Sequence, residues 1–272
     1  MDCYYINLAS ETEKRAQLEK NFAQHNTLNW PLHRFEALDK KYVEANNIQG
    51  QLSNGAKGCF LSHRELMNQN INNKDHLFIV EDDIVLCNKT QTVIEKIITT
   101  PEFEWDLLYT DICVPNAATM LDLFQLKQSC LKNDQLRILD LCEMNFASTA
   151  AYIVNKNSIS KVASMLNAMQ QLDTPIDLTY RALVQTRKLK AFVAFPFLTS
   201  LSSESEDSNI QTKEHAYTEL VWHSFRKLIW MGGKSDHIEK NLTLIREGDF
   251  TDEAKAFSTI LSGTFSQSFI QK

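Results

Sequence analysis

The sequence predicts an α/β protein in which a mostly parallel sheet is flanked by helices and followed by a helical C-terminal extension. Three observations support this fold class. Short apolar, β-prone runs alternate with segments of helical periodicity, as in chains that build parallel sheets. A chain of 272 residues with 43% hydrophobic residues can bury one large core. The pattern stays helical after residue 213, so we expect a sheet domain at 1–212 and an extension at 213–272 that packs on it.

The expected elements follow one another in a regular order. Each strand is a short apolar run, and each helix has apolar residues three or four positions apart; the first helix also opens with a serine cap and early acids. The expected strands lie at residues 3–7, 33–38, 76–80, 105–109, 146–154 and 190–195. The expected helices lie at residues 10–24, 58–71, 92–98, 158–170 and 176–187. Residues 116–135 are expected as an insertion beside the sheet, and the Ser-rich, acidic stretch 200–208 as a mobile loop.

Composition and charge exclude several classes of function. The formal net charge is −6 and there is no long run of Lys or Arg, so the sequence gives no sign of a basic surface that would bind a nucleic acid. The six cysteines include no close C-x-x-C pair, which argues against a structural zinc site and favours free thiols in a reducing compartment. The N-terminal MDCYYINL lacks the features of a signal peptide, and no apolar run reaches the roughly 20 residues of a membrane span. We therefore expect a cytoplasmic protein.

The strongest functional signal is a run of three acids after the apolar segment HLFIV. Glu81, Asp82 and Asp83 follow this expected strand directly, at the carboxyl end where open α/β sheets bind their ligands. Adjacent carboxylates repel one another unless a cation lies among them, and Mg²⁺ or Mn²⁺ prefers oxygen ligands and bridges to phosphates. By itself the run fits a cation-bound diphosphate and a solvated strand corner equally well.

A second signal is the segment GAKGCFLSHRELM, which places Ser62 and His63 near the start of a helix. Considered alone, Ser62 is explained as a helix cap and His63 as a hydrogen-bonded structural residue. No glycine lies between Gly58 and Gly232, so neither a P-loop nor a G-x-G-x-x-G turn is available there. A bound nucleotide would be held in some other way.

Taken together, the segments resemble glycosyltransferase family 25, the lipooligosaccharide galactosyl- and glucosyltransferases of Gram-negative bacteria. The resemblance covers roughly residues 3–212. Its segments, in chain order, are YYINLASETEKRAQLEKNF, FEALD, GAKGCFLSHRELM, FIVEDD, WDLLY, STAAYIVN and TPID. It implies a GT-A fold, a UDP-hexose donor carrying galactose or glucose, and a divalent cation, Mn²⁺ or Mg²⁺. It also implies transfer with inversion to an oligosaccharide or lipid-linked glycan acceptor.

The resemblance also implies roles for individual residues. Asp83 is the first choice as metal ligand, with Glu81 as a second ligand, and Asp82 is expected to support the ribose or the diphosphate. The residues expected to bind the donor are Asn7, Leu8, Arg15, Ala37, Asp39, Ser62, His63, Glu81 and Asp82.

Three positions depart from the family pattern. A family glycine is replaced by Ser148 before the T-x-x-Y segment, and another by Lys40 after the A-x-D segment. Both changes affect the local loop geometry, since glycine adopts backbone conformations that other residues resist. The late S-D-I motif reads Ser208, Asn209, Ile210, which removes a carboxylate.

An inverting transfer needs a base that takes the proton of the acceptor hydroxyl, and the acids at 81–83 serve the leaving group. The candidates are Asp177, in TPID at an expected helix start, and Asp111, at the end of WDLLYTD. A first-turn acid favoured by the helix dipole would also explain Asp177, and a turn residue would explain Asp111. We favour Asp177 because its segment matches the family's P-x-D, and we expect Asp111 nearer the diphosphate.

The C-terminal extension holds an apolar group next to two basic residues. Trp222, Phe225 and Trp230 lie close in sequence to Arg226 and Lys227, a composition compatible with peripheral contact with the cytoplasmic face of the inner membrane. Packing of these side chains on the sheet domain explains the same pattern more simply.

Two other classes of function stay open. One is a catalytically idle sugar-nucleotide-binding or scaffold protein of the same fold. The other is a metal-dependent nucleotidyltransferase or phosphotransferase, which would direct attack at phosphorus and would not release free UDP.

Overall fold

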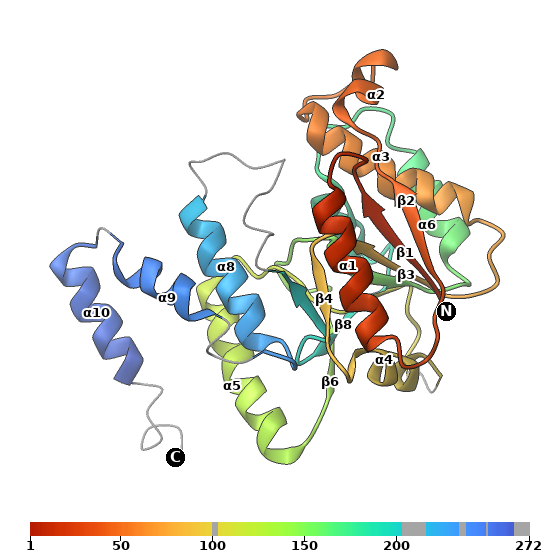
Figure 1. Ribbon diagram of the computed structural model, residues 1–272. Coiled ribbons are helices and arrows are strands. Elements are labelled where there is room, and N and C mark those ends of the chain that lie inside the picture. Colours follow the sequence, from red (N-terminus) through yellow and green to blue (C-terminus); the bar gives the residue numbers. More distant parts are fainter. Residues whose placement is uncertain (100–102, 203–215, 234–237, 249, 264–272) are drawn as a thin grey trace.

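The computed structural model describes residues 1–99, 103–202, 216–233, 238–248 and 250–263 (Figure 1). The strands are β1 (Asp2–Asn7), β2 (Leu32–Glu36), β3 (Leu77–Glu81), β4 (Ile84–Leu86), β5 (Leu107–Tyr109), β6 (Arg137–Asp140), β7 (Ala151–Val154), β8 (Ala191–Phe195) and β9 (Thr199–Leu201). The helices are α1 (Thr12–His25), α2 (Lys40–Ala45), α3 (Asn54–Gln69), α4 (Thr90–Thr99), α5 (Ala117–Asn133), α6 (Ile159–Asn167), α7 (Ile176–Gln185), α8 (Ala216–Ile229), α9 (Glu239–Arg246) and α10 (Asp252–Gly263).

Seven strands form the central sheet, in the order β2-β1-β3-β7-β5-β8-β6. β1 pairs in parallel with β2 and β3, and β5 pairs in parallel with β8. β7 is antiparallel to β3 and β5, and β6 is antiparallel to β8. Five strands therefore point one way and two point the other way. This confirms the predicted α/β fold with a mostly parallel sheet flanked by helices.

Both faces of the sheet are buried, as the continuous apolar run of β3 predicts. Leu77 and Ile79 of β3 belong to one core cluster, and Phe78 and Val80 belong to a second cluster on the opposite face. Helices α3, α6 and α7 contribute side chains to the first cluster, and α1 and α4 contribute to the second. The carboxyl end of β3 is thereby fixed between two packed layers.

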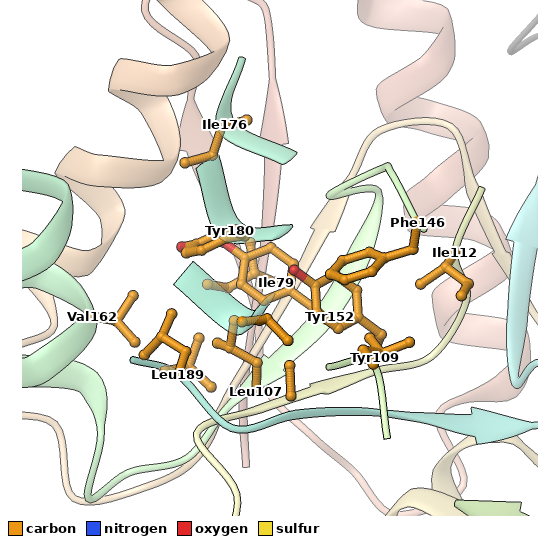
Figure 2. Packing of buried hydrophobic residues seen from close by; sticks show 14 of the residues in the cluster. Ile79, Leu107, Tyr109, Ile112, Phe146, Tyr152, Val162, Ile176, Tyr180 and Leu189 are labelled. Atoms are coloured by element: carbon orange, nitrogen blue, oxygen red, sulfur yellow. The ribbon is translucent and has the colours of Figure 1, made fainter. Parts of the chain in front are cut away.

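Aromatic residues fill the first cluster beside β5 and β7, as Figure 2 shows. The rings of Tyr109 and Tyr180 lie 5.8 Å and 5.6 Å from the ring of Tyr152, and Phe146 meets Tyr109 edge-on at 5.4 Å. All four side chains are fully buried. They belong to the core, although three of them carry a hydroxyl into it.

The structure departs from the predicted elements where a segment is short. Elements α2, β4, β6 and β9 were not expected, because runs of three to six residues are too short to show a period. The predicted strand 146–154 shortens to β7, and the segment 116–135 is mostly the helix α5. The predicted loop 200–208 begins inside β9, which pairs with β4, so its start is wrong. Residues 203–210, with the altered S-D-I motif, lie outside the described residues.

The C-terminal helix α8 packs on the sheet domain. The Met231 amide donates to the Phe197 carbonyl at 2.8 Å, and the Trp230 indole donates to the Leu198 carbonyl at 3.2 Å. Helix α9 contacts α8, whereas α10 has no buried residue and lies at the periphery in Figure 1. Among the described helices, none combines the length and the apolar character that a bilayer crossing requires.

Candidate functional site

The three acids lie at the end of β3, as expected. Glu81 is the last residue of β3, and Asp82 and Asp83 form the turn into β4. Burial, and then the carboxylates of Glu81 and Asp82, raise the pKa of Asp83 to about 7. Asp83 Oδ1 is buried and has no hydrogen-bond partner among the described residues. An orphaned carboxylate oxygen beside two other acids fits a hard divalent cation, which would neutralise the repulsion and take that oxygen as a ligand.

Asp82 is oriented by the end of β1. Asn7 Nδ2 donates to Asp82 Oδ2 at 2.7 Å and to the Glu11 carbonyl at 2.9 Å. Arg34 Nε in turn donates to Asn7 Oδ1 at 3.1 Å. Because the Asn7 side chain is buried behind these partners, it holds Asp82 in place, and we no longer expect it to meet the donor directly.

A cleft of about 400 Å³, here called the first cleft, opens beside the acids. It is formed by the loop after β1, the loop between β2 and α2, the face of α3 and the end of β3. The expected donor-binding residues that line it are Leu8, Ala37, Asp39, Ser62, His63, Glu81 and Asp82. The structure thus gathers residues from four separate sequence segments into one cleft.

Contacts between α3 and the loop after β2 set the shape of the first cleft. Ser62 Oγ donates to the Gly58 carbonyl at 2.7 Å and accepts from the Leu38 amide at 2.8 Å. A Cβ on Gly58 would lie 2.2 Å from the Leu38 carbonyl oxygen, so only glycine permits this close approach. Asp39 accepts from the Tyr42 amide at 2.8 Å and caps α2. The loop is therefore fastened at both of its ends.

The structure corrects the expectation for Arg15. This side chain pairs with Glu19 one turn along α1, at 3.0 Å and with both groups well exposed, and it is not among the residues that line the first cleft. Ser10, Glu11 and Lys14 line the cleft instead. Successive helical residues point about 100° apart, so the face of α1 that carries Lys14 turns Arg15 away from the cleft.

A second cleft, of about 360 Å³, also borders the acids Glu81 and Asp83 and is lined by Asp177. The Asp177 carboxylate accepts from the Ser148 amide at 3.0 Å and from the Leu178 amide at 2.8 Å, at the start of α7. Ser148 has φ 85°, the left-handed region that favours glycine. This serine therefore adopts the conformation that the family's glycine would allow, at a cost of about 1–2 kcal/mol.

The structure shows that the assignment of Asp111 as a candidate base is wrong. Its carboxylate is buried and accepts from Arg226 of α8, with Oδ2 at 2.5 Å from Nη2 and 3.1 Å from Nε. Burial raises the pKa of Asp111 and the guanidinium opposes that rise. Arg226 lines the second cleft, whereas Asp111 is not among its lining residues. Asp111 therefore holds Arg226 and is not placed to take a proton from a substrate.

Three residues line both clefts: Cys59, Glu81 and Asp83. The two clefts consequently meet at the acids, where a molecule in one could react with a molecule in the other. Thr149 Oγ1 donates to Glu81 Oε1 at 3.0 Å and orients that carboxylate at the junction.

Several lining residues could not be found from the sequence. The cleft face of α1 depends on the helix rotation, so the sequence alone does not separate Lys14 from Arg15. Cys59 precedes His63 by four residues on α3, a spacing that puts both on one face and could have indicated its place. Arg226 comes from far along the chain, and no local pattern predicts its contact with Asp111.

One curated relative is the lipooligosaccharide biosynthesis protein lic2B of Haemophilus influenzae, which is 26% identical to this chain over 174 residues. The aligned region covers 59% of this chain and 62% of the relative, so the chain spans less than two thirds of the length of that relative.

Solved structures show a distant likeness in the arrangement of elements. A galactosyltransferase LgtC in complex with donor and acceptor sugar analogs is 12% identical with a TM-score of 0.38, over 71% of this chain and 73% of that chain. The inositol-1-phosphate CTP transferase of T. maritima is 14% identical with a TM-score of 0.35, over 86% of this chain and 79% of that chain.

The sequence model of a family described as glycosyltransferase family 25, LPS biosynthesis protein, matches residues 1–180, about two thirds of the chain. The matched region contains α3 and the three acids, and it ends within α7 after Asp177. The chain belongs to glycosyltransferase family 25.

Proposed function

We propose that this protein transfers a hexose, galactose or glucose, from a UDP-sugar to a hydroxyl of a lipooligosaccharide-type acceptor, with inversion at the anomeric carbon. One observation carries the proposal: two clefts meet at the acids Glu81 and Asp83, and a further carboxylate, Asp177, lines the second cleft. This arrangement supports the proposal, because inversion requires a donor and an attacking hydroxyl to meet at one point from separate binding spaces.

In this proposal the donor occupies the first cleft. The fastened loop at Ala37 and Asp39, together with Leu8, would hold the uridine. Lys14 lines the same cleft within electrostatic reach of Asp82 and Asp83, so it would meet the diphosphate. Asp82, fixed by the β1 end, would accept from the ribose or orient the diphosphate.

The acids would hold a divalent cation, Mn²⁺ or Mg²⁺, through Asp83 and Glu81. When bound, such a cation supplies charge stabilisation to departing UDP. The orphaned Asp83 oxygen and the raised pKa of that carboxyl are the observations that support a cation there.

The acceptor would occupy the second cleft, with Asp177 as the base. Two amide donors fix the Asp177 carboxylate, and a carboxylate has about four lone-pair sites, so about two are left for the acceptor hydroxyl. Trp222 of α8 also lines this cleft and offers an aromatic face for a sugar ring. We propose in addition that residues 213–272 form an extension of the domain at 1–212, and that Trp222 and Arg226 of α8 complete the acceptor side.

The test measures UDP release and transfer product from UDP-galactose and UDP-glucose, with Mn²⁺ and a truncated lipooligosaccharide, and assigns the anomeric configuration by NMR. Asp177→Asn should lower the transfer rate by roughly 10²- to 10⁴-fold, the usual contribution of a general base, with UDP affinity kept. Asp173→Asn is the matched control, because this acid accepts from the Gln51 amide at the protein surface. An Asp177→Asn enzyme with unaltered kcat would rule Asp177 out.

The other classes of function give different products in the same assay. An idle binding or scaffold protein would bind UDP without release of UDP from either donor. A nucleotidyltransferase or phosphotransferase would form a sugar phosphate or a nucleotidyl ester, because attack would take place at phosphorus.

We also propose a cytoplasmic location with peripheral contact at the inner membrane, where lipid-linked acceptors are held. The apolar group expected for that contact faces the sheet domain instead: Trp222 lines the second cleft, and the Trp230 indole donates to the Leu198 carbonyl. Helix α10 offers another surface, because Phe257, Ile260 and Leu261 are exposed and share one helix face. Fractionation of cells that express α10 variants with these residues changed to Ser tests the membrane contact.

A further inference from the structure

Helix α3 and strand β3 bring a thiol, an imidazole and a carboxylate together. Cys59 and His63 are four residues apart on α3 and share one face, which lies against Glu81 at the end of β3. The sulfur, one imidazole nitrogen and one carboxylate oxygen all lie within 4.8 Å of one another. Within this group, His63 Nε2 and Glu81 Oε1 are 3.6 Å apart. These three side chains could therefore hold a metal ion.

The imidazole of His63 has one ring nitrogen, Nε2, that is available to a ligand. The side chain is fully buried, and Nε2 has no hydrogen-bond partner among the described residues, since 3.6 Å to Glu81 is too long for one. The other ring nitrogen, Nδ1, lies 2.9 Å from the Tyr152 hydroxyl. A metal ion requires the tautomer in which Nδ1–H donates to the Tyr152 hydroxyl, because Nε2 then presents its lone pair on the side of Glu81, where a cation would separate it from the carboxylate. Metal-binding histidines usually have such an outer partner on the second nitrogen.

We propose that Cys59, His63 and Glu81 form a binding site for a thiophilic divalent cation of the Zn²⁺ class, which shares Glu81 with the proposed oxygen-ligand site at Asp83 but takes its other ligands from α3. Thiolate and imidazole select Zn²⁺ over Mn²⁺ or Mg²⁺, which prefer oxygen. Tetrahedral ligands with bonds of about 2.0–2.3 Å lie roughly 3.3–3.8 Å from one another. The His63–Glu81 distance already falls in this range, and the other pairs need to close by about 1 Å at most. A water completes the four ligands, and the Cys59 thiol gives its proton to solvent on binding.

The site is accessible, because all three ligands line the first cleft. Its occupation would take Glu81 away from the catalytic cation of the proposed function, so Zn²⁺ would inhibit transfer. That consequence rests on the proposed function, whereas the binding site does not. The binding test therefore uses a spectroscopic signal that needs no activity.

The experiment adds Co²⁺ to the metal-free full-length chain and records the thiolate-to-cobalt charge-transfer band in the near ultraviolet. One equivalent should produce the band in the wild type. Cys142→Ser, a control at a partly buried cysteine outside the site, should keep it, and so should Asp83→Asn. Cys59→Ser and Cys59→Ala should lose it. Absence of the band in the wild type, or its persistence in either Cys59 variant, would overturn the proposal.

A second measurement protects the test against a misfolded Cys59 variant. Tyr152→Phe keeps the buried ring but removes the oxygen that faces His63 Nδ1. It should weaken Zn²⁺ binding by about 10- to 100-fold, as measured by competition with a chromophoric chelator. Circular dichroism checks that the variant is folded. Unchanged Zn²⁺ affinity in folded Tyr152→Phe would contradict the proposed role of His63.

Discussion

Removal of the Arg226 guanidinium tests how much the ion pair between Arg226 and Asp111 stabilises the packing of α8 on the sheet domain. In Arg226→Met the Asp111 carboxylate stays buried but loses both of its hydrogen bonds from Arg226. Breaking one side of a buried ion pair costs about 3–5 kcal/mol, because an uncompensated charge is left behind. For a chain of this size about 1 kcal/mol shifts Tm by roughly 2–4 °C. The variant should therefore unfold roughly 6–20 °C below the wild type.

The dependence on pH identifies the stranded carboxylate as the cause. Burial raises the pKa of Asp111, and loss of Arg226 removes the charge that opposes this rise. A folded-state pKa above the unfolded value gives stability that is present at low pH and lost as pH rises through the folded pKa. The stability deficit of Arg226→Met should therefore be full near pH 8 and shrink as pH falls through the raised pKa of Asp111.

The double variant Asp111→Asn/Arg226→Met supplies the control. It removes the charge as well as its partner, so it should recover most of the lost stability. The assay is thermal unfolding followed by circular dichroism, with urea unfolding as a second measure. An Arg226→Met protein that unfolds within about 2 °C of the wild type at neutral pH would refute the reasoning, as would a double variant less stable than the single one.

Three further predictions concern the two clefts. Lys14→Met should raise KM for the UDP-sugar about 10-fold, equivalent to about 1.4 kcal/mol. Arg15→Met should change this KM by less than about twofold, since of these two neighbours Lys14 lines the first cleft and Arg15 does not. Equal effects of the two substitutions would contradict this placement. Trp222→Ala should raise KM for the acceptor roughly 3- to 10-fold without affecting KM for the donor. A change in KM for the donor alone would contradict the assignment of Trp222 to the acceptor cleft. Gly58→Ala should lower the free energy of unfolding, measured in urea, by about 1–3 kcal/mol, because the added Cβ would lie 2.2 Å from the Leu38 carbonyl oxygen. A variant as stable as the wild type would show that the loop at Leu38 can move away from the new methyl group.

The sequence predicted the sheet because its strands are strongly apolar. The run at β3 is buried on both faces, so its composition alone marks it as a central strand and places the acids at its carboxyl end. The direction of β7 was not predictable, because strand polarity depends on the path of the chain between strands and not on the strand residues. Short elements such as α2 and β9 carry too few residues to show a period.

The candidate site was predictable where one segment carries the information. The acids and the Ser62–His63 pair are local motifs, and the structure places both in the first cleft. Contacts between distant segments were not predictable. Arg226 and Asp111 lie 115 positions apart in the sequence, yet they form a buried hydrogen bond. Because of this contact, Asp111 has a structural role and is not the base. The serine at position 148 was visible in the sequence, but its left-handed backbone became clear only from its φ of 85°.

The most direct test of cation-dependent transfer at the three acids compares Asp83→Asn with Asp39→Asn in the UDP-release assay, with and without EDTA. Asp83→Asn should lower kcat by roughly 10²- to 10³-fold, since a cation ligand stabilises leaving-group charge that develops in the transition state. Asp39→Asn, in the part of the first cleft that is proposed to bind the uridine, should mainly raise KM for the donor. EDTA should abolish turnover of the wild type, and Mn²⁺ should restore it. Full turnover in metal-free buffer, or equal losses of kcat in the two variants, would contradict the account.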